Sequence, residues 1–176
     1  ISVGTLPSVN EEGAEKLVQA VEALWDVGIV VVTAAGNYGP RPGSITSPGI
    51  SKKVITVGSC DDQFYMEEGK KKRKSYSGRG PTAECVVKPD LLAPGSYITS
   101  CNARYREKGQ KPYTMKSGTS MSTPVVSGAI ALLLSKYPDM SNVEVKLRLR
   151  ESSIDIGRPQ NEQGWGLLNV EKLLKE

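Results

Sequence analysis

The residues best suited to chemistry lie in segment 118–124, which reads Gly-Thr-Ser-Met-Ser-Thr-Pro and leads into the apolar run 125–134. The hydroxyl of Ser120, set between small residues where a helix would begin, could act as a nucleophile if a base lay beside it. The chain contains no histidine. Either Ser120 only caps a helix, or its base belongs to sequence outside this chain.

The predicted position of Ser120 in the first helical turn suits an oxyanion. Backbone N–H groups there have no intrahelical partner, and the helix dipole favours negative charge. Attack on a peptide carbonyl places negative charge on the carbonyl oxygen, which the Ser120 N–H could stabilise. Gly118 would permit a tight turn, Pro124 suits an early helical position, and Gly128 would allow close helix packing.

Three segments, in order along the chain, resemble the subtilisin-like serine proteases (subtilases). Residues 29–37 end in Ala-Ala-Gly-Asn and resemble the family strand whose asparagine is an oxyanion donor. Residues 77–81 (Ser-Gly-Arg-Gly-Pro) and 88–95 (Lys-Pro-Asp-Leu-Leu-Ala-Pro-Gly) resemble a second family stretch. Residues 118–124 resemble the nucleophile segment, with Ser122 where the family usually has alanine.

This resemblance covers nearly the whole chain and implies a serine endopeptidase with a polypeptide substrate. It makes Ser120 the nucleophile, with the Asn37 side chain and the Ser120 amide as oxyanion donors. The family triad runs Asp, His, Ser along the chain, so its first two members would precede residue 1. We therefore expect residues 1–176 to be the C-terminal part of a single catalytic domain. The isolated chain would be inactive and would pair with the missing N-terminal half or self-associate.

The resemblance also implies two backbone edges that hold an extended peptide as an added strand. Residues 2–4 resemble one edge, and residues 34–36 resemble the facing wall of the primary specificity pocket, with Thr46 near its floor. The residues assigned to substrate binding are Ser2, Val3, Gly4, Ala34, Ala35, Gly36 and Thr119. From the residues alone, Asn37 could equally be a turn asparagine, and residues 2–4 a terminus with no role.

Calcium is the usual stabilising ion of the family, and the sequence leaves it open as a cofactor. Its ligands could be carbonyls of the 49–54 turn together with Asp90. Lys88 stands where a second acid would be wanted, so we predict no definite metal site. The acid pairs 61–62 and 67–68 are expected to be solvated, and the basic run 70–74 to form a surface loop.

Composition excludes some classes of function. The net charge is +4, and run 70–74 accounts for it, so we expect no nucleic-acid partner. The longest apolar run is too short to cross a bilayer, so we expect no membrane partner. The three cysteines, at 60, 85 and 101, show no metal-binding spacing and are expected to be buried or half-buried thiols, with one disulfide as the alternative. An odd number of cysteines favours a cytoplasmic over a secreted protein.

Periodicity predicts the elements that must position these residues. A helix over 12–27 precedes a buried strand over 29–34, and a second parallel strand covers 53–58. A turn is expected over 91–95, a short strand over 97–100, and a hairpin within 102–116. Ser141 and Glu144 form a capping box, and Asn169 caps a last short helix. The predicted fold is α/β: an incomplete, subtilisin-like three-layer α/β/α arrangement with a parallel sheet, comprising only the later strands and the nucleophile helix.

Two other functions remain open at this point. A non-catalytic, subtilase-like module could bind peptides or act as a scaffold without a base. An esterase of the α/β-hydrolase type would need Gly-x-Ser-x-Gly, but Ser122 occupies the position of the second glycine.

Overall fold

The computed structural model describes residues 1–6, 11–62 and 75–175. The helices and strands in chain order are α1 (Glu11–Asp26), β1 (Val32–Ala34), β2 (Ile55–Ser59), β3 (Leu91–Ala93), β4 (Ile98–Cys101), β5 (Tyr113–Lys116), α2 (Thr119–Lys136), α3 (Asn142–Ser152), α4 (Gln160–Gln163) and α5 (Val170–Leu174).

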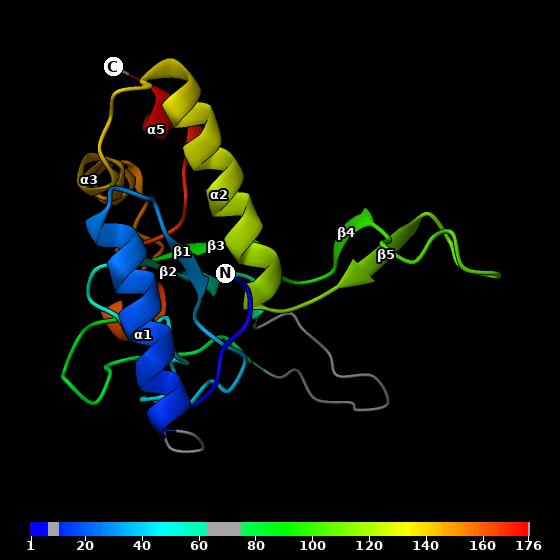
Figure 1. The fold of residues 1–176 in the computed structure, drawn as a ribbon, viewed down its shortest axis with the longest axis horizontal. Helices are drawn as coiled ribbons and strands as arrows, with labels where there is room; N and C mark the ends of the chain where they lie inside the picture. Colours follow the sequence, from blue (N-terminus) through cyan, green and yellow to red (C-terminus); the bar gives the residue numbers. More distant parts are fainter. Residues whose placement is uncertain (7–10, 63–74, 176) are drawn as a thin grey trace.

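A three-stranded parallel sheet forms the centre, in the order β1-β2-β3. Val32 pairs with Ile55, and Val57 pairs with Leu91. Every residue of the three strands is buried, as expected for a parallel sheet covered on both faces. Figure 1 shows α2 along one side of the sheet and α1 on the other. The predicted α/β/α layering is therefore confirmed.

The core lies between this sheet and the helices. Strand residues such as Ile55 and Val57 pack with Val126 and Leu133 of α2 and with Leu149 of α3, and all five are fully buried. Fully burying one such aliphatic side chain contributes about 1.5–3 kcal/mol to stability. This packing holds the first turn of α2 firmly against the sheet.

The helix boundary signals are confirmed. The helix predicted over 12–27 is α1, within one residue at each end. The Ser141 side chain accepts a hydrogen bond from the Glu144 N–H, and the Glu144 carboxylate accepts one from the Ser141 N–H, which completes the capping box of α3. Asn169 caps α5 by accepting from the Lys172 N–H at 2.9 Å.

Several predictions of strands were wrong in detail. Residues 91–93, expected in a turn, form the third parallel strand, because Leu92 hydrogen-bonds within a buried ladder that also includes Gly166 and Leu168. Strand β1 is shorter than the predicted 29–34. The hairpin strands β4 and β5 pair antiparallel in a separate sheet, which projects away from the parallel sheet in Figure 1.

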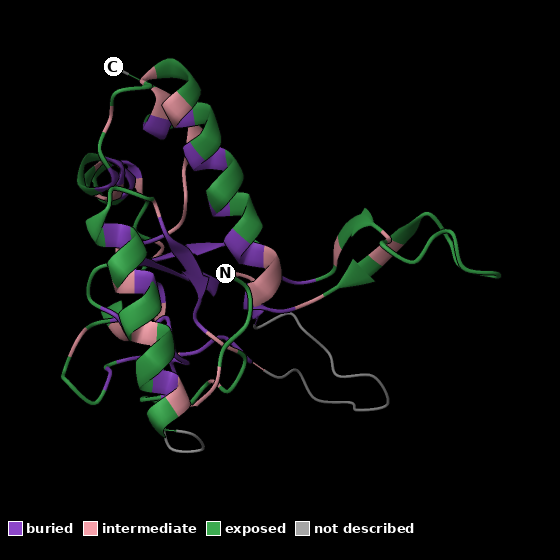
Figure 2. Cartoon of the chain, in the orientation of Figure 1, coloured by how far each residue is buried: buried purple, intermediate pink, exposed green. Residues whose placement is uncertain are grey.

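One face of α2 is open. Residues 124, 125, 128, 131 and 132 are exposed, and Leu132 retains 53% of its accessible surface. Figure 2 shows the exposed and buried faces alternating along this helix. Gly128 lies on this open face, where a Cβ would meet no described atom within 4 Å, so its role in close helix packing stays a prediction.

Candidate active site

Ser120 lies in the first turn of α2, beside the N-terminal segment. Its Oγ donates a hydrogen bond to the Ser2 carbonyl at 2.7 Å, and the Ser2 hydroxyl donates to the Ser120 carbonyl at 2.8 Å. The N-cap residue of α2 is Gly118, which has no side chain to cap the helix. Ser120 is therefore not a capping serine, and its hydroxyl is directed away from the helix axis toward residue 2.

Asn37 lies just after the carboxyl end of β1 and contacts the start of α2. Its Oδ1 accepts hydrogen bonds from the Thr119 backbone N–H at 2.9 Å and from the Thr119 hydroxyl at 3.1 Å. Two donors on one oxygen fix the orientation of the carboxamide. The Nδ2 group of this exposed residue is thus turned away from Thr119, and it donates no hydrogen bond within the part of the chain that the structure describes.

Thr119 differs from its predicted role. It was assigned to substrate binding, but it is 0% exposed. Its hydroxyl accepts a hydrogen bond from the Gly36 N–H at 3.1 Å and donates to Asn37 Oδ1. The Thr119 side chain therefore acts on the site through Asn37 and Gly36 rather than by touching a substrate.

Gly118 makes room for the Asn37 carboxamide. Its φ is +149°, within the region that favours glycine, and a Cβ there would lie 3.0 Å from Asn37 Nδ2. From the sequence, Gly118 is predicted only to permit a tight turn. Its contact with a residue 81 positions away could not be found from local sequence.

The two predicted peptide edges lie on either side of Thr46. Atoms of Thr46 would come within 2.5–2.7 Å of a Cβ placed on Gly4 or Gly36, so both glycines pack against this side chain. Ser2, Val3 and Gly4 are exposed, whereas Ala34 and Ala35 are buried. The Ala34 N–H donates to the Ile1 carbonyl at 3.2 Å, which holds the N-terminal segment alongside β1.

The oxygens considered for calcium are already hydrogen-bonded. The Gly49 carbonyl accepts from the Thr56 hydroxyl at 2.7 Å. The Asp90 carboxylate accepts from the Thr56 N–H at 2.7 Å and pairs with Lys88 at 2.6 Å. Within the described ranges, no three acidic or thiol side chains gather as a metal-binding group.

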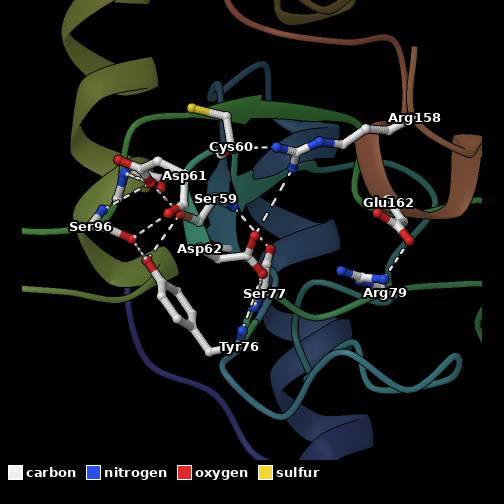
Figure 3. A network of polar contacts seen from close by, with 12 residues as sticks. Ser59, Cys60, Asp61, Asp62, Tyr76, Ser77, Arg79, Ser96, Arg158 and Glu162 are labelled. Carbon is white, nitrogen blue, oxygen red and sulfur yellow. Dashed lines mark hydrogen bonds and ion pairs between the residues drawn. The ribbon is translucent and has the colours of Figure 1, made fainter. Parts of the chain in front are cut away.

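The acid pair 61–62 was expected to be solvated, and this was wrong. Asp62 is 1% exposed and accepts hydrogen bonds from the Tyr76 and Ser77 N–H groups at 3.1 and 3.0 Å (Figure 3). Asp61 accepts from the Gly95 and Ser96 N–H groups, each at 2.9 Å. Both carboxylates thus satisfy buried backbone donors in loops that follow β2 and β3. The pair 67–68 and the basic run 70–74 lie outside the described residues.

The cysteines also differ from expectation. Cys85 and Cys101 are exposed and only Cys60 is half-buried, and all three are free thiols. Burial raises the pKa of the Cys60 thiol to about 11, and the neighbouring Asp61 carboxylate adds to this rise. Cys60 therefore stays protonated at neutral pH.

No helix among the described residues is long and apolar enough to cross a membrane.

Comparisons with known proteins agree with the motifs. A model of the subtilase family (peptidase S8) matches residues 1–166. Serine protease AprX of Bacillus subtilis is 42% identical over 172 residues, which cover 92% of this chain and 39% of that protein. Subtilisin DY of Bacillus licheniformis is 37% identical over 161 residues, which cover 90% of this chain and 52% of that protein. The chain thus spans about two fifths to half the length of these relatives.

Solved structures give the same fold. A psychrophilic protease matches with a TM-score of 0.75 and 26% identity, over 97% of this chain and 56% of that one. The prenylagaramide maturation protease PagA matches with a TM-score of 0.65 and 29% identity, over 89% of this chain and 53% of that one.

Proposed function

The chain belongs to the subtilase family, and from this premise we propose that it supplies the nucleophile and the oxyanion hole of a serine endopeptidase. The observation that carries the proposal is the way Thr119 holds Asn37. Both Thr119 donors bind Oδ1, so the carboxamide presents Nδ2 beside the helical turn that bears Ser120. The same contact caps the first N–H of α2, and it leaves the Nδ2 hydrogens as the donors that Asn37 can offer to a substrate oxygen.

In the proposed reaction, Ser120 Oγ attacks the carbonyl carbon of a peptide bond. The negative charge that develops on the carbonyl oxygen is stabilised by the Asn37 Nδ2–H and the Ser120 backbone N–H. The C–N bond then breaks, leaving an acyl group on Ser120, and water releases this group in a second step. The Ser2–Gly4 and Ala34–Gly36 segments would hold the peptide as an added strand.

The Ser120 proton needs a basic acceptor, and among the described residues the Ser120 hydroxyl donates to the Ser2 carbonyl, which is too weak a base to take the proton. We infer that a histidine, oriented by an aspartate, comes from sequence outside these 176 residues, because the chain has no histidine. The Ser2 carbonyl now accepts the Ser120 hydroxyl and would give way to that histidine. Without it, an oxyanion hole alone provides roughly 10³–10⁴-fold acceleration over water, so the isolated chain should be essentially inactive.

The open face of α2 supports the same inference. Apolar residues that include Val125 and Leu132 are exposed along a helix whose opposite face is the core. We propose that the rest of the domain covers this face. The isolated chain should then self-associate in gel filtration, and co-expression with the remaining sequence should yield a compact 1:1 complex.

A second candidate function rests on the absent histidine. A peptide-binding or scaffolding module would use the same two backbone edges without cleaving the bound chain. It would not require the Asn37 and Ser120 donors to lie next to one another.

Labelling the full-length protein with a fluorophosphonate probe separates the two functions. A protease gives an adduct on Ser120, mapped by mass spectrometry, whereas a binding module gives none. Ser120→Ala should abolish the adduct. Ser122→Ala is the matched control, since this buried serine donates to the Ala93 carbonyl and faces away from the site. An adduct elsewhere, or none in a folded full-length protein, would exclude the proposed nucleophile.

A further inference from the structure

Two lysine side chains enter the protein interior at the amino ends of β2 and β3. Lys88 is 1% exposed, and its Nζ donates to Asp90 Oδ2 at 2.6 Å and to the Val54 carbonyl at 3.0 Å. Lys146, from α3, has a side chain that is 18% exposed. Two cations thus share one buried carboxylate, an arrangement that burial would disfavour unless other groups offset the second charge.

The second charge is offset by backbone oxygens. The Lys146 Nζ donates to the carbonyls of Lys52, Lys53 and Val54 at 2.9, 2.8 and 3.2 Å. Three consecutive carbonyls pointing at one atom would repel one another without a cation between them. An ammonium group carries three N–H donors, one for each of these carbonyls.

Aromatic rings complete the surroundings of Lys146. Its Nζ lies 5.7 Å from the centre of the Trp25 ring and 6.0 Å from that of Trp165, within range of cation–π attraction. The pKa of Lys146 is lowered to about 8, chiefly by burial, with the Asp90 carboxylate opposing this shift and the nearby Lys88 adding to it. The group is therefore mostly charged at neutral pH.

The oxygens that hold the two lysines are those that a cation would use. The Val54 carbonyl and Asp90 serve both ammonium groups, with Asp90 Oδ1 3.9 Å from the Lys146 Nζ. Calcium takes six to eight oxygens at about 2.3–2.6 Å. Among the described residues, the oxygens bonded or paired to the two ammonium groups are three carbonyls and the two of Asp90, and a divalent ion among them would face two positive groups at close range. These residues do not fit calcium.

We propose that at neutral pH the ammonium groups of Lys88 and Lys146 occupy an oxygen-lined cation site, so that this part of the fold needs no bound metal. The lysines supply the positive charge that keeps the 52–54 carbonyls and Asp90 together. The inference is independent of the proposed catalytic function.

Replacing the internal cations should convert the cluster into a metal site. The double variant Lys88→Glu with Lys146→Ala adds a carboxylate and vacates the space among the carbonyls. In the full-length protein it should bind one more calcium ion per molecule than the unsubstituted protein. A hundredfold excess of calcium over Kd should raise its unfolding temperature by roughly 5–10 °C. Terbium should luminesce on tryptophan excitation, because Trp25 and Trp165 flank the site.

The matched control is Lys172→Glu with Lys175→Ala, which makes the same charge change at two exposed positions of the C-terminal region. It should gain neither calcium nor terbium signal. A folded Lys88→Glu, Lys146→Ala protein that binds no additional calcium would overturn the proposal, as would an equal gain by the control.

A measurement on the unsubstituted protein covers the case in which the double variant does not fold. An amine-acylating reagent should modify Lys88 and Lys146 far more slowly than the exposed Lys53, and millimolar calcium should leave this protection unchanged. If calcium released Lys146 to the reagent, the ion would be displacing the ammonium, and the proposal would fail.

Discussion

The polar groups at the two ends of the parallel sheet differ in how much of their hydrogen-bonding capacity is already used within the protein. At the carboxyl end of β1, Thr119 holds Asn37 through Oδ1 alone, and the Ser120 hydroxyl donates to the Ser2 carbonyl of the exposed N-terminal segment. At the amino ends of β2 and β3, Lys88, Asp90 and Lys146 use their donors and acceptors on one another and on the backbone.

The difference shows what separates a binding site from a structural cluster. Both regions contain polar groups whose orientation is fixed by hydrogen bonds. A site, however, needs a group whose remaining hydrogen-bonding capacity faces outward, whereas a structural cluster leaves none. In open α/β sheets, ligands bind outside the carboxyl ends of the strands, which agrees with the location of Asn37.

The largest effect on stability is expected at the Lys88–Asp90–Lys146 cluster, at the amino ends of β2 and β3. Lys88→Met would leave Asp90 without its nearest cation, and breaking a buried pair in this way costs about 3–5 kcal/mol of unfolding free energy. The unfolding temperature should fall by roughly 10 °C. Differential scanning calorimetry of the full-length protein measures this temperature. A fall of only a degree or two would show that Lys88 is not the main neutralising partner of Asp90.

A comparable effect, on activity rather than stability, is expected at the carboxyl end of β1, where Asn37 and Ser120 lie. Asn37→Leu removes the Nδ2 donors, and we expect kcat to fall about 10²–10³-fold with little change in KM. Peptide hydrolysis by the full-length protein gives both constants. Should KM rise while kcat stays constant, Asn37 would be holding the ground-state substrate instead of the oxyanion.

A smaller effect is expected from the residue that positions Asn37. Thr119→Val removes the hydrogen bond from the Thr119 hydroxyl to Asn37 Oδ1 but keeps the bond from the Thr119 backbone N–H. Because one hydrogen bond is lost, kcat should fall about tenfold. Thr119→Ser should restore most of the activity. Equal losses in Thr119→Val and Thr119→Ser would mean that the methyl group, and hence packing, is what matters.

The smallest effect is expected at an exposed lysine that serves as a control for Lys88. Lys53 pairs with Asp26 at 2.7 Å, but the two side chains are 42% and 57% exposed. Lys53→Met should leave the unfolding temperature almost unchanged, because solvent screens exposed pairs. A loss similar to that of Lys88→Met would argue that burial does not distinguish the two pairs.

Local patterns in the sequence were sufficient for much of the fold. The spacing of apolar residues predicted α1, and the Ser141–Glu144 pair predicted the start of α3, because each signal lies within a few residues of the feature it specifies. Strand β3 was missed, since a three-residue strand has too short a pattern to separate from a turn. The short strand over 97–100 and the hairpin were expected, but their pairing in a separate β4–β5 sheet was not, because pairing partners are chosen in three dimensions.

The sequence by itself determined the kinds of groups present: a serine at a helix start, an asparagine after a buried strand, no histidine, and a lysine two residues before Asp90. Only the tertiary structure decided how they combine. It brought Thr119 onto Asn37 across 82 positions and Lys146 onto the carbonyl of Lys52 across 94. It also buried Asp62, which the sequence had placed in solvent. The physical reason is that a polar group's hydrogen-bonding partners depend on which distant segments the core packs together, and no local pattern records that.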